Sequence, residues 1–127
     1  MKDEKGKCQC VHKCADFATY QLEAIKTASY DFKTWDMALP YLALGVVGEA
    51  GEVAEQIKKH VRGDKELKTE KIKEELGDVL WYIANLCETL GFSLQDVAEG
   101  NIAKLRKRHG ETFSGYGHPD TRQDSEE

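Results

Sequence analysis

Two pairs of acidic side chains at helical spacing are the residues of this sequence best suited to chemistry. Glu49 and Glu52 lie three apart in GVVGEAGEVAE, and Glu75 and Asp78 lie three apart in KEELGDVLWYIANL. On a helix, residues three apart share a face. One such pair is most often a solvated charged surface, but each pair here borders an apolar stripe and is accompanied by glycines. We therefore treat them as candidates for a common site.

Four carboxylates in one place require a counter-charge. Two like charges 4 Å apart repel each other by about 4 kcal/mol at an effective dielectric constant of 20. The carboxylates must therefore bind protons or hold a cation between them. Carboxylate oxygens without a neighbouring thiolate or imidazole favour Mg²⁺, with Mn²⁺ as the alternative, over zinc. Mg²⁺ keeps waters and accepts phosphate oxygens as further ligands.

The glycines near the first pair have a cost that needs a reason. Gly45, Gly48 and Gly51 recur every third residue inside a helical pattern, and each costs about 1 kcal/mol relative to alanine. We expect Gly45 and Gly48 to leave room for a phosphate chain and a hydrated metal ion. Gly77 is expected to do the same on the opposite helix.

Helical periodicity and capping residues predict an all-α protein, a small four-helix bundle completed by oligomerisation. The predicted helices cover residues 17–29, 39–61, 69–90 and 93–109. Asp16, Thr69 and Ser93 are the expected N-caps, Pro40 is expected in the first turn of its helix, and Gly91 ends the third. If the second and third helices pack antiparallel through their apolar stripes, their acidic edges face one another. The second helix places its apolar stripe at Leu42, Val46, Ala50, Val53, Ile57 and Val61.

Composition limits the class of protein. A chain of 127 residues suits one domain with a modest core, and its net charge of −5 gives no general basic surface for nucleic acid. No uninterrupted apolar stretch is long enough for a membrane span, and the N-terminus does not resemble a secretory signal, so we expect a cytoplasmic protein. The expected organisation is a flexible arm at 1–15, a helical domain at 16–110 and a mobile tail at 111–127.

The cysteines leave one alternative metal site open. Cys8, Cys10, His12 and Cys14 lie together in CQCVHKC, which could bind zinc, although the spacing differs from the usual C-x2-C arms. We favour a flexible arm over a metal site there. Cys87 lies in an apolar helical run and is expected in the core as a reduced thiol.

Together, the two acidic motifs resemble the signature of the MazG-like nucleotide pyrophosphohydrolases. NIAKLRKRHGETFSG is similar to the end of that family's domain, and TYQLEAIKTA to its first helix, so the resemblance covers roughly residues 16 to 115. It implies an all-α, Mg²⁺-dependent enzyme, dimeric or tetrameric, that cleaves nucleoside triphosphates to monophosphate and pyrophosphate. It implies that the metal ligands are Glu49, Glu52, Glu75 and Asp78.

The resemblance also implies a nucleotide pocket, lined by Trp35, Tyr82, Asn101, Lys104 and Arg108. Trp35 is similar to an aromatic residue that stacks on the base in dCTP-preferring relatives. A second tryptophan of those relatives corresponds here to about Lys59. From spacing alone, the row of polar residues on the fourth helix is equally consistent with a solvated basic face. Glu49 or Glu52 is the candidate base that activates water, and the sequence does not choose between them.

Several other functions compete with this prediction. A phosphoribosyl-ATP pyrophosphohydrolase or a dUTP-type enzyme would share the same superfamily. A di-iron carboxylate bundle requires Glu-x-x-His pairs, and the sequence has none. A helical interaction module without catalysis remains as the non-enzymatic alternative.

Overall fold

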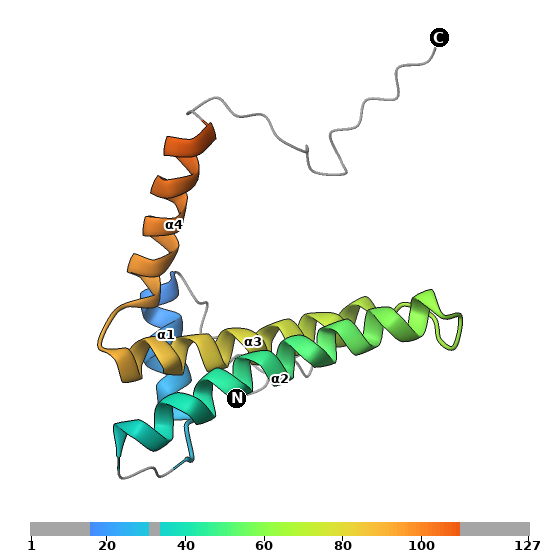
Figure 1. Cartoon of the computed structure of the whole chain (residues 1–127), viewed down its shortest axis with the longest axis horizontal. Helices are drawn as coiled ribbons and strands as arrows, with labels where there is room; N and C mark the ends of the chain where they lie inside the picture. The colour runs from blue at the N-terminus through green and yellow to red at the C-terminus, as the bar shows by residue number, and fades with distance from the viewer. Residues whose placement is uncertain (1–15, 31–33, 110–127) are drawn as a thin grey trace, which may run out of the picture. The chain divides into compact units, whose positions relative to one another are not determined.

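The computed structural model describes residues 16–30 and 34–109, and it is built from helices alone within those ranges. The four helices, shown in Figure 1, are α1 (Phe17–Lys26), α2 (Trp35–Val61), α3 (Thr69–Leu90) and α4 (Leu94–His109). The predicted all-α class is confirmed. The expected N-terminal arm with its cysteine cluster, and the expected tail from residue 111, lie outside the described residues.

The long helices α2 and α3 form an antiparallel pair, as the sequence predicted. They run side by side along their lengths, and α1 packs against α3 near the end where α3 stops (Figure 1). Internal contacts divide the chain into two units, Met1–Asp96 and Val97–Glu127. The first unit contains α1, α2, α3 and the first turn of α4, while the remaining turns of α4 belong to the second.

Local capping rules account for most of the helix ends. Asp16 accepts a hydrogen bond from the Thr19 amide at 2.7 Å, and this bond lowers the pKa of the Asp16 carboxyl. Ser93 accepts a hydrogen bond from the Gln95 amide at 3.1 Å. Gly91 ends α3 in the left-handed region, with φ of 80°. These three predictions are confirmed.

Other predicted ends differ from the structure. Thr69 is the first residue of α3 and not its cap, because Lys68 holds the extended cap position. Helix α2 begins at Trp35, so Pro40 lies inside the helix and not in its first turn. The amides of Met37 and Ala38 bond the Thr34 carbonyl and start the helix one turn earlier. Helix α1 ends at Lys26, three residues before the predicted end.

The core is small and lies where α1 crosses α3. Its buried members are Ala24, Ala84, Cys87 and Leu94, with Trp81 and Tyr20 among the partly buried side chains packed on it. Cys87 is therefore a buried free thiol, as predicted, and burial raises its pKa.

The apolar stripes of the hairpin are real but incompletely covered. On α2, Leu42 is fully buried, whereas Ile57 is 43% exposed and Val61 is 79% exposed. On α3, Leu76 is 53% exposed. A stripe of this kind gains stability only when another surface covers it. The described residues of one chain do not supply that cover.

Helix α2 also has the length and composition of a membrane-spanning segment. An 18-residue segment within Asp36–Val61 has a mean hydropathy of 1.2, and 11% of that segment is buried. A single helix of this kind is weak evidence for a span. Moreover, Glu49 and Glu52 lie within it, and carboxylates are costly in the bilayer interior.

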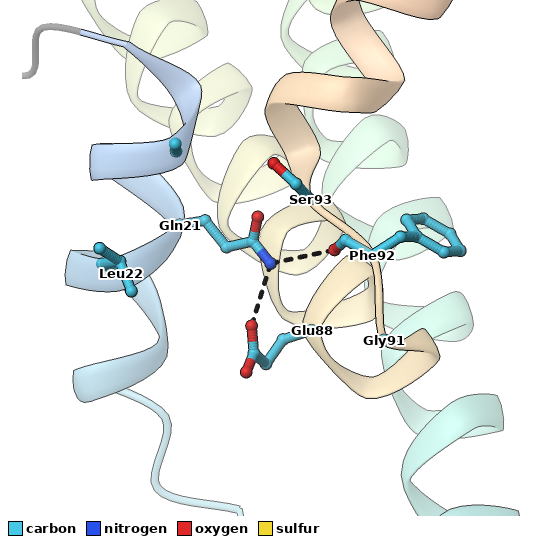
Figure 2. Close-up of a pocket in the computed structure, with 7 residues that line it drawn as sticks. Gln21, Leu22, Glu88, Gly91, Phe92 and Ser93 are labelled. Carbon is cyan, nitrogen blue, oxygen red and sulfur yellow. Dashed lines mark hydrogen bonds between the residues drawn. The ribbon is translucent and has the colours of Figure 1, made fainter.

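Gln21 joins α1 to the α3–α4 connection. Its Nε2 donates to Glu88 Oε2 at 3.0 Å and to the Phe92 carbonyl at 3.2 Å, while its Oε1 accepts from the Leu94 amide at 2.7 Å. Figure 2 shows the two Nε2 bonds. They lie beside an open hollow whose volume is about 410 Å³. Because these bonds use the whole amide group of Gln21, we assign this side chain a structural role.

Candidate functional site

The acidic edges of α2 and α3 meet, as the sequence predicted. Glu49 of α2 and Glu75 and Asp78 of α3 each direct a carboxylate oxygen into one group, and these oxygens lie within 4.8 Å of one another. The helical spacing places Glu75 and Asp78 on one face of α3, and the antiparallel hairpin brings Glu49 opposite them. Glu52 is exposed and lies outside this group of three.

The group differs in burial from one member to the next. Glu75 is 6% exposed, Glu49 is partly buried and Asp78 is exposed. Burial, followed by the charges of Asp78, Glu75 and Glu52, raises the pKa of the Glu49 carboxyl. The negative charges therefore act on one another, and without a counter-charge their repulsion opposes the packing of α2 on α3.

Lys71 supplies a counter-charge that the sequence analysis overlooked. Its Nζ lies 3.0 Å from Glu75 Oε1 and 3.3 Å from Glu74 Oε2. Both contacts raise the pKa of Lys71, and the contact with Glu75 contributes more than the contact with Glu74. The spacing of Lys71 four residues before Glu75 was a signal in the sequence, because residues at i and i+4 are neighbours on a helix.

The chemistry of the donor set fits a hard divalent cation. All three converging groups are carboxylates, and no histidine or cysteine joins them among the described residues. Oxygen-only ligands suit Mg²⁺ and Mn²⁺, and one or two protein carboxylates with waters are the usual Mg²⁺ arrangement. A dication at the group would offset the negative charges that, after burial, raise the pKa of Glu49. The residues present therefore fit such an ion.

The space beside Gly45 is filled by Tyr82. A Cβ atom at residue 45 would lie 2.1 Å from Cε1 of the Tyr82 ring, far inside van der Waals contact. The expectation that Gly45 leaves room for a phosphate chain is wrong, because the bare backbone accommodates an aromatic side chain of this chain. A Cβ atom added at Gly48 or Gly77, by contrast, would meet no atom within 4 Å beyond its own stretch of helix, so the space there is open.

Tyr82 links the acidic group to an aromatic cluster. A hydrogen bond with Tyr41, then burial, then the charges of Glu49 and Asp78 raise the pKa of the Tyr82 hydroxyl. The Tyr82 ring contacts Tyr41 and lies edge-on to Trp81, with centroids 4.9 Å apart. Tyr82 therefore borders the site, and neighbouring rings fix its position.

Comparison with known proteins decides the family. The model of the MazG nucleotide pyrophosphohydrolase domain matches residues 39–113. The chain belongs to this family. The Gene 37 protein of Mycobacterium phage L5 is 38% identical over 97 residues, which cover 70% of this chain and 84% of the relative. The uncharacterized protein YvdC of Bacillus subtilis is 33% identical over 89 residues, covering 62% and 84% respectively. No solved structure matches the chain significantly.

The matched MazG range contains all four predicted carboxylates, but the structure treats the other predicted site residues differently. Asn101, Lys104 and Arg108 lie on α4 within the second unit, where all three are exposed. Their role in binding phosphates therefore stays a prediction. Trp35 is the first residue of α2 and precedes the matched range. Its side chain lies outside the described structure, so its stacking role also stays a prediction.

Proposed function

We propose that this MazG-family chain is a Mg²⁺-dependent nucleoside triphosphate pyrophosphohydrolase. It would convert a ribo- or deoxyribonucleoside triphosphate to the monophosphate and pyrophosphate. The observation that carries the proposal is the convergence of Glu49, Glu75 and Asp78 between two antiparallel helices. Carboxylates gathered this closely, with one of them buried, are consistent with a site that holds a cation and a polyanionic substrate.

In this proposal the carboxylates have two roles, metal binding and acceptance of a proton from water. Glu49, Glu75 and Asp78 would hold the ion, which when bound would neutralise phosphate charge and favour deprotonation of water. Glu52 lies outside the converging group and would join the ligands or act as the base. Glu49 is the other candidate base, and one of these two carboxylates would accept a proton from the attacking water. The water oxygen forms a bond to phosphorus at the α–β link, and the pyrophosphate leaves in line with the attack. The proton that water loses passes to the carboxylate base.

The proposal assigns nucleotide binding to five further residues. Tyr82 borders the carboxylates and would contact the substrate, and Trp35 would stack on the base. Asn101, Lys104 and Arg108 would bind phosphates, because a basic row is complementary to a polyanion.

We further propose that the enzyme works as a homodimer or homotetramer in the cytoplasm, without nucleic acid or membrane partners. The support for self-association is the apolar surface that the described residues of one chain leave uncovered, including Val47 and Leu76. Burial of such surface contributes about 25 cal/mol per Å².

The test is pyrophosphate release from a panel of NTPs and dNTPs, with and without Mg²⁺, with the monophosphate identified as co-product. The panel includes dUTP and phosphoribosyl-ATP. Glu75→Gln and Asp78→Asn remove negative charge from the converging group at nearly constant size. Glu70→Gln removes an exposed charge from the same helix and is the matched control.

We expect metal-dependent activity in the wild type and in the control, and a loss of roughly 100-fold or more in the two site variants, the scale of removing a group that stabilises the transition state. Folded, active site variants would contradict the assigned roles. A folded wild-type protein inactive on the whole panel would favour a helical interaction module instead.

A further inference from the structure

Lys71 is placed where helix stability alone would not place it. It is the third residue of α3, in the first turn, where the helix dipole disfavours positive charge. It also precedes both of its acidic partners, and a lysine N-terminal to glutamate at i and i+4 is the less favourable order. Its position therefore calls for another explanation than helix formation.

The two partners of Lys71 differ greatly in their surroundings. The side chain of Glu75 is 8% exposed and belongs to the converging carboxylates, whereas that of Glu74 is 69% exposed and lies outside that group. The Lys71 ammonium contacts both, at 3.0 Å and 3.3 Å. One cation is thus shared between a buried carboxylate that needs a partner and an exposed one that does not.

We propose that Lys71 is a displaceable counter-ion of the metal site. It neutralises Glu75 while no divalent cation is present, and it moves fully onto Glu74 when a cation binds to Glu75. The inference rests on the metal site of the proposed function, and it adds an ammonium group that competes with the metal ion for the same carboxylate.

Electrostatics gives the reason for the exchange. A buried carboxylate without a partner is strongly unfavourable, so Glu75 needs Lys71 when the metal is absent. A dication bound to Glu75 satisfies the same charge and repels the nearby ammonium group. Because Glu74 already lies 3.3 Å from Lys71 Nζ, the ammonium can leave Glu75 by a small rotation of its flexible side chain and keep a carboxylate partner.

Competition and positioning predict opposite changes in metal affinity. If Lys71 competes with the metal, removing its charge frees Glu75 and tightens binding. If Lys71 instead holds Glu75 in the ligating orientation through one oxygen, removing it loosens binding. The sign of the change therefore separates the two roles.

The experiment measures Mg²⁺ and Mn²⁺ binding to the full chain without nucleotide, by calorimetry for Mg²⁺ and by electron paramagnetic resonance for Mn²⁺. Lys71→Met removes the ammonium and keeps an aliphatic chain of similar length. Lys73→Met removes one positive charge from an exposed position of the same helix and measures the general effect of net charge. We expect Lys71→Met to bind both ions about fivefold more tightly than Lys73→Met, the scale of a half-exposed ion pair.

A second pair of variants tests the receiving carboxylate. Glu74→Gln removes the group that accepts Lys71 after displacement, and Glu70→Gln is its charge-matched control on the same helix. We expect Glu74→Gln to bind Mg²⁺ about two- to threefold more weakly than Glu70→Gln, again the scale of an exposed ion pair. Equal affinities would show that Glu74 does not receive the lysine.

A direct readout follows the lysine itself. The ¹⁵Nζ resonance of Lys71, assigned by its absence from Lys71→Met, should shift on addition of Mg²⁺, and the shift should differ in Glu74→Gln. Unchanged or weaker metal binding in Lys71→Met, measured against Lys73→Met, would overturn the inference while leaving the metal site intact. Absence of metal binding from every folded variant would instead overturn the proposed function on which it rests.

Discussion

The contact between Gly45 and Tyr82 predicts that alanine is harmful at a helical position where it is ordinarily favourable. In Gly45→Ala the new Cβ would lie 2.1 Å from Cε1 of the tyrosine ring, whereas ordinary contact begins at 3.4 Å. The ring cannot retreat freely, because the rings of Tyr41 and Trp81 lie beside it, at 6.3 Å and 4.9 Å between centroids. Either the ring or α2 must move.

The expected magnitude combines two opposing effects. Glycine to alanine inside a helix contributes about 1 kcal/mol of stability, while inserting a methyl group into packed surroundings costs about 1–3 kcal/mol. The overlap here is severe and involves a held ring, so the cost should reach or exceed the upper end. We expect a net loss of about 1–2 kcal/mol in the free energy of unfolding, or roughly 4–8 °C in Tm.

Gly48→Ala is the matched control, one helical turn away on α2. Its added Cβ would meet no atom within 4 Å beyond its own stretch of helix, so the propensity gain of about 1 kcal/mol should appear without a clash. If Gly48 keeps space for substrate, this variant should be more stable and less active. Thermal and urea denaturation at a fixed protein concentration measure both stabilities.

A double-mutant cycle assigns the loss to the ring. Tyr82→Leu removes the ring, and in that background Gly45→Ala should be neutral or stabilising. The coupling between the two substitutions should be about 1–3 kcal/mol. The reasoning is refuted if Gly45→Ala is as stable as Gly48→Ala, or if the cycle shows no coupling.

Two further predictions concern stability. Gln21→Leu should lower the free energy of unfolding by about 2–4 kcal/mol, because it leaves the buried Leu94 amide without an acceptor. The control Gln95→Ala loses an exposed hydrogen bond to the Phe17 amide and should cost under about 1 kcal/mol. Equal losses of the two variants in denaturation experiments would contradict this account. The pKa of the Glu49 carboxyl is raised from its ordinary 4.5, so the folded state binds a proton at Glu49 more readily than the unfolded chain does. Ionisation of Glu49 therefore lowers the stability of the folded state as the pH rises through the raised pKa. In EDTA, Glu49→Gln should therefore have a higher Tm than the wild type at pH 7, with the difference shrinking as the pH falls toward 4.5; a difference independent of pH would argue against the shift.

The features of the fold that were predicted correctly depend on short stretches of chain. Asp16, Gly91 and Ser93 act within a few residues of their own positions, so local rules suffice for them. The start of α2 was missed because Pro40 was assumed to mark the first turn. The amides that begin this helix belong to residues before the proline, and no side chain makes a capping hydrogen bond that would indicate this start in the sequence.

The site shows the same division. The meeting of Glu49 with Glu75 and Asp78 follows from helical spacing and one short turn, and both were readable in the sequence. The reason for glycine at position 45 could not be predicted from the sequence, because it depends on the position of the Tyr82 ring, 37 residues further along the chain. The exposure of Glu52 likewise depends on how α2 is rotated about its axis against α3. The ion pair of Lys71 with Glu75 was available from spacing alone and was overlooked.

The arrangement of α3 explains why these tests can be interpreted separately. Its first half carries Lys71, Glu75 and Asp78, while its second half carries Ala84 and Cys87 in the core that α1 covers. Charges can therefore be changed in the first half while the packing that holds α1 in place is kept. The boundary between the two halves is the region of Tyr82, which contacts aromatic neighbours and feels the charges of the acidic group. A substitution that displaces the Tyr82 ring, such as Gly45→Ala on α2, should disturb both stability and metal binding. Lys71→Met, by contrast, should alter metal binding far more than it alters the core.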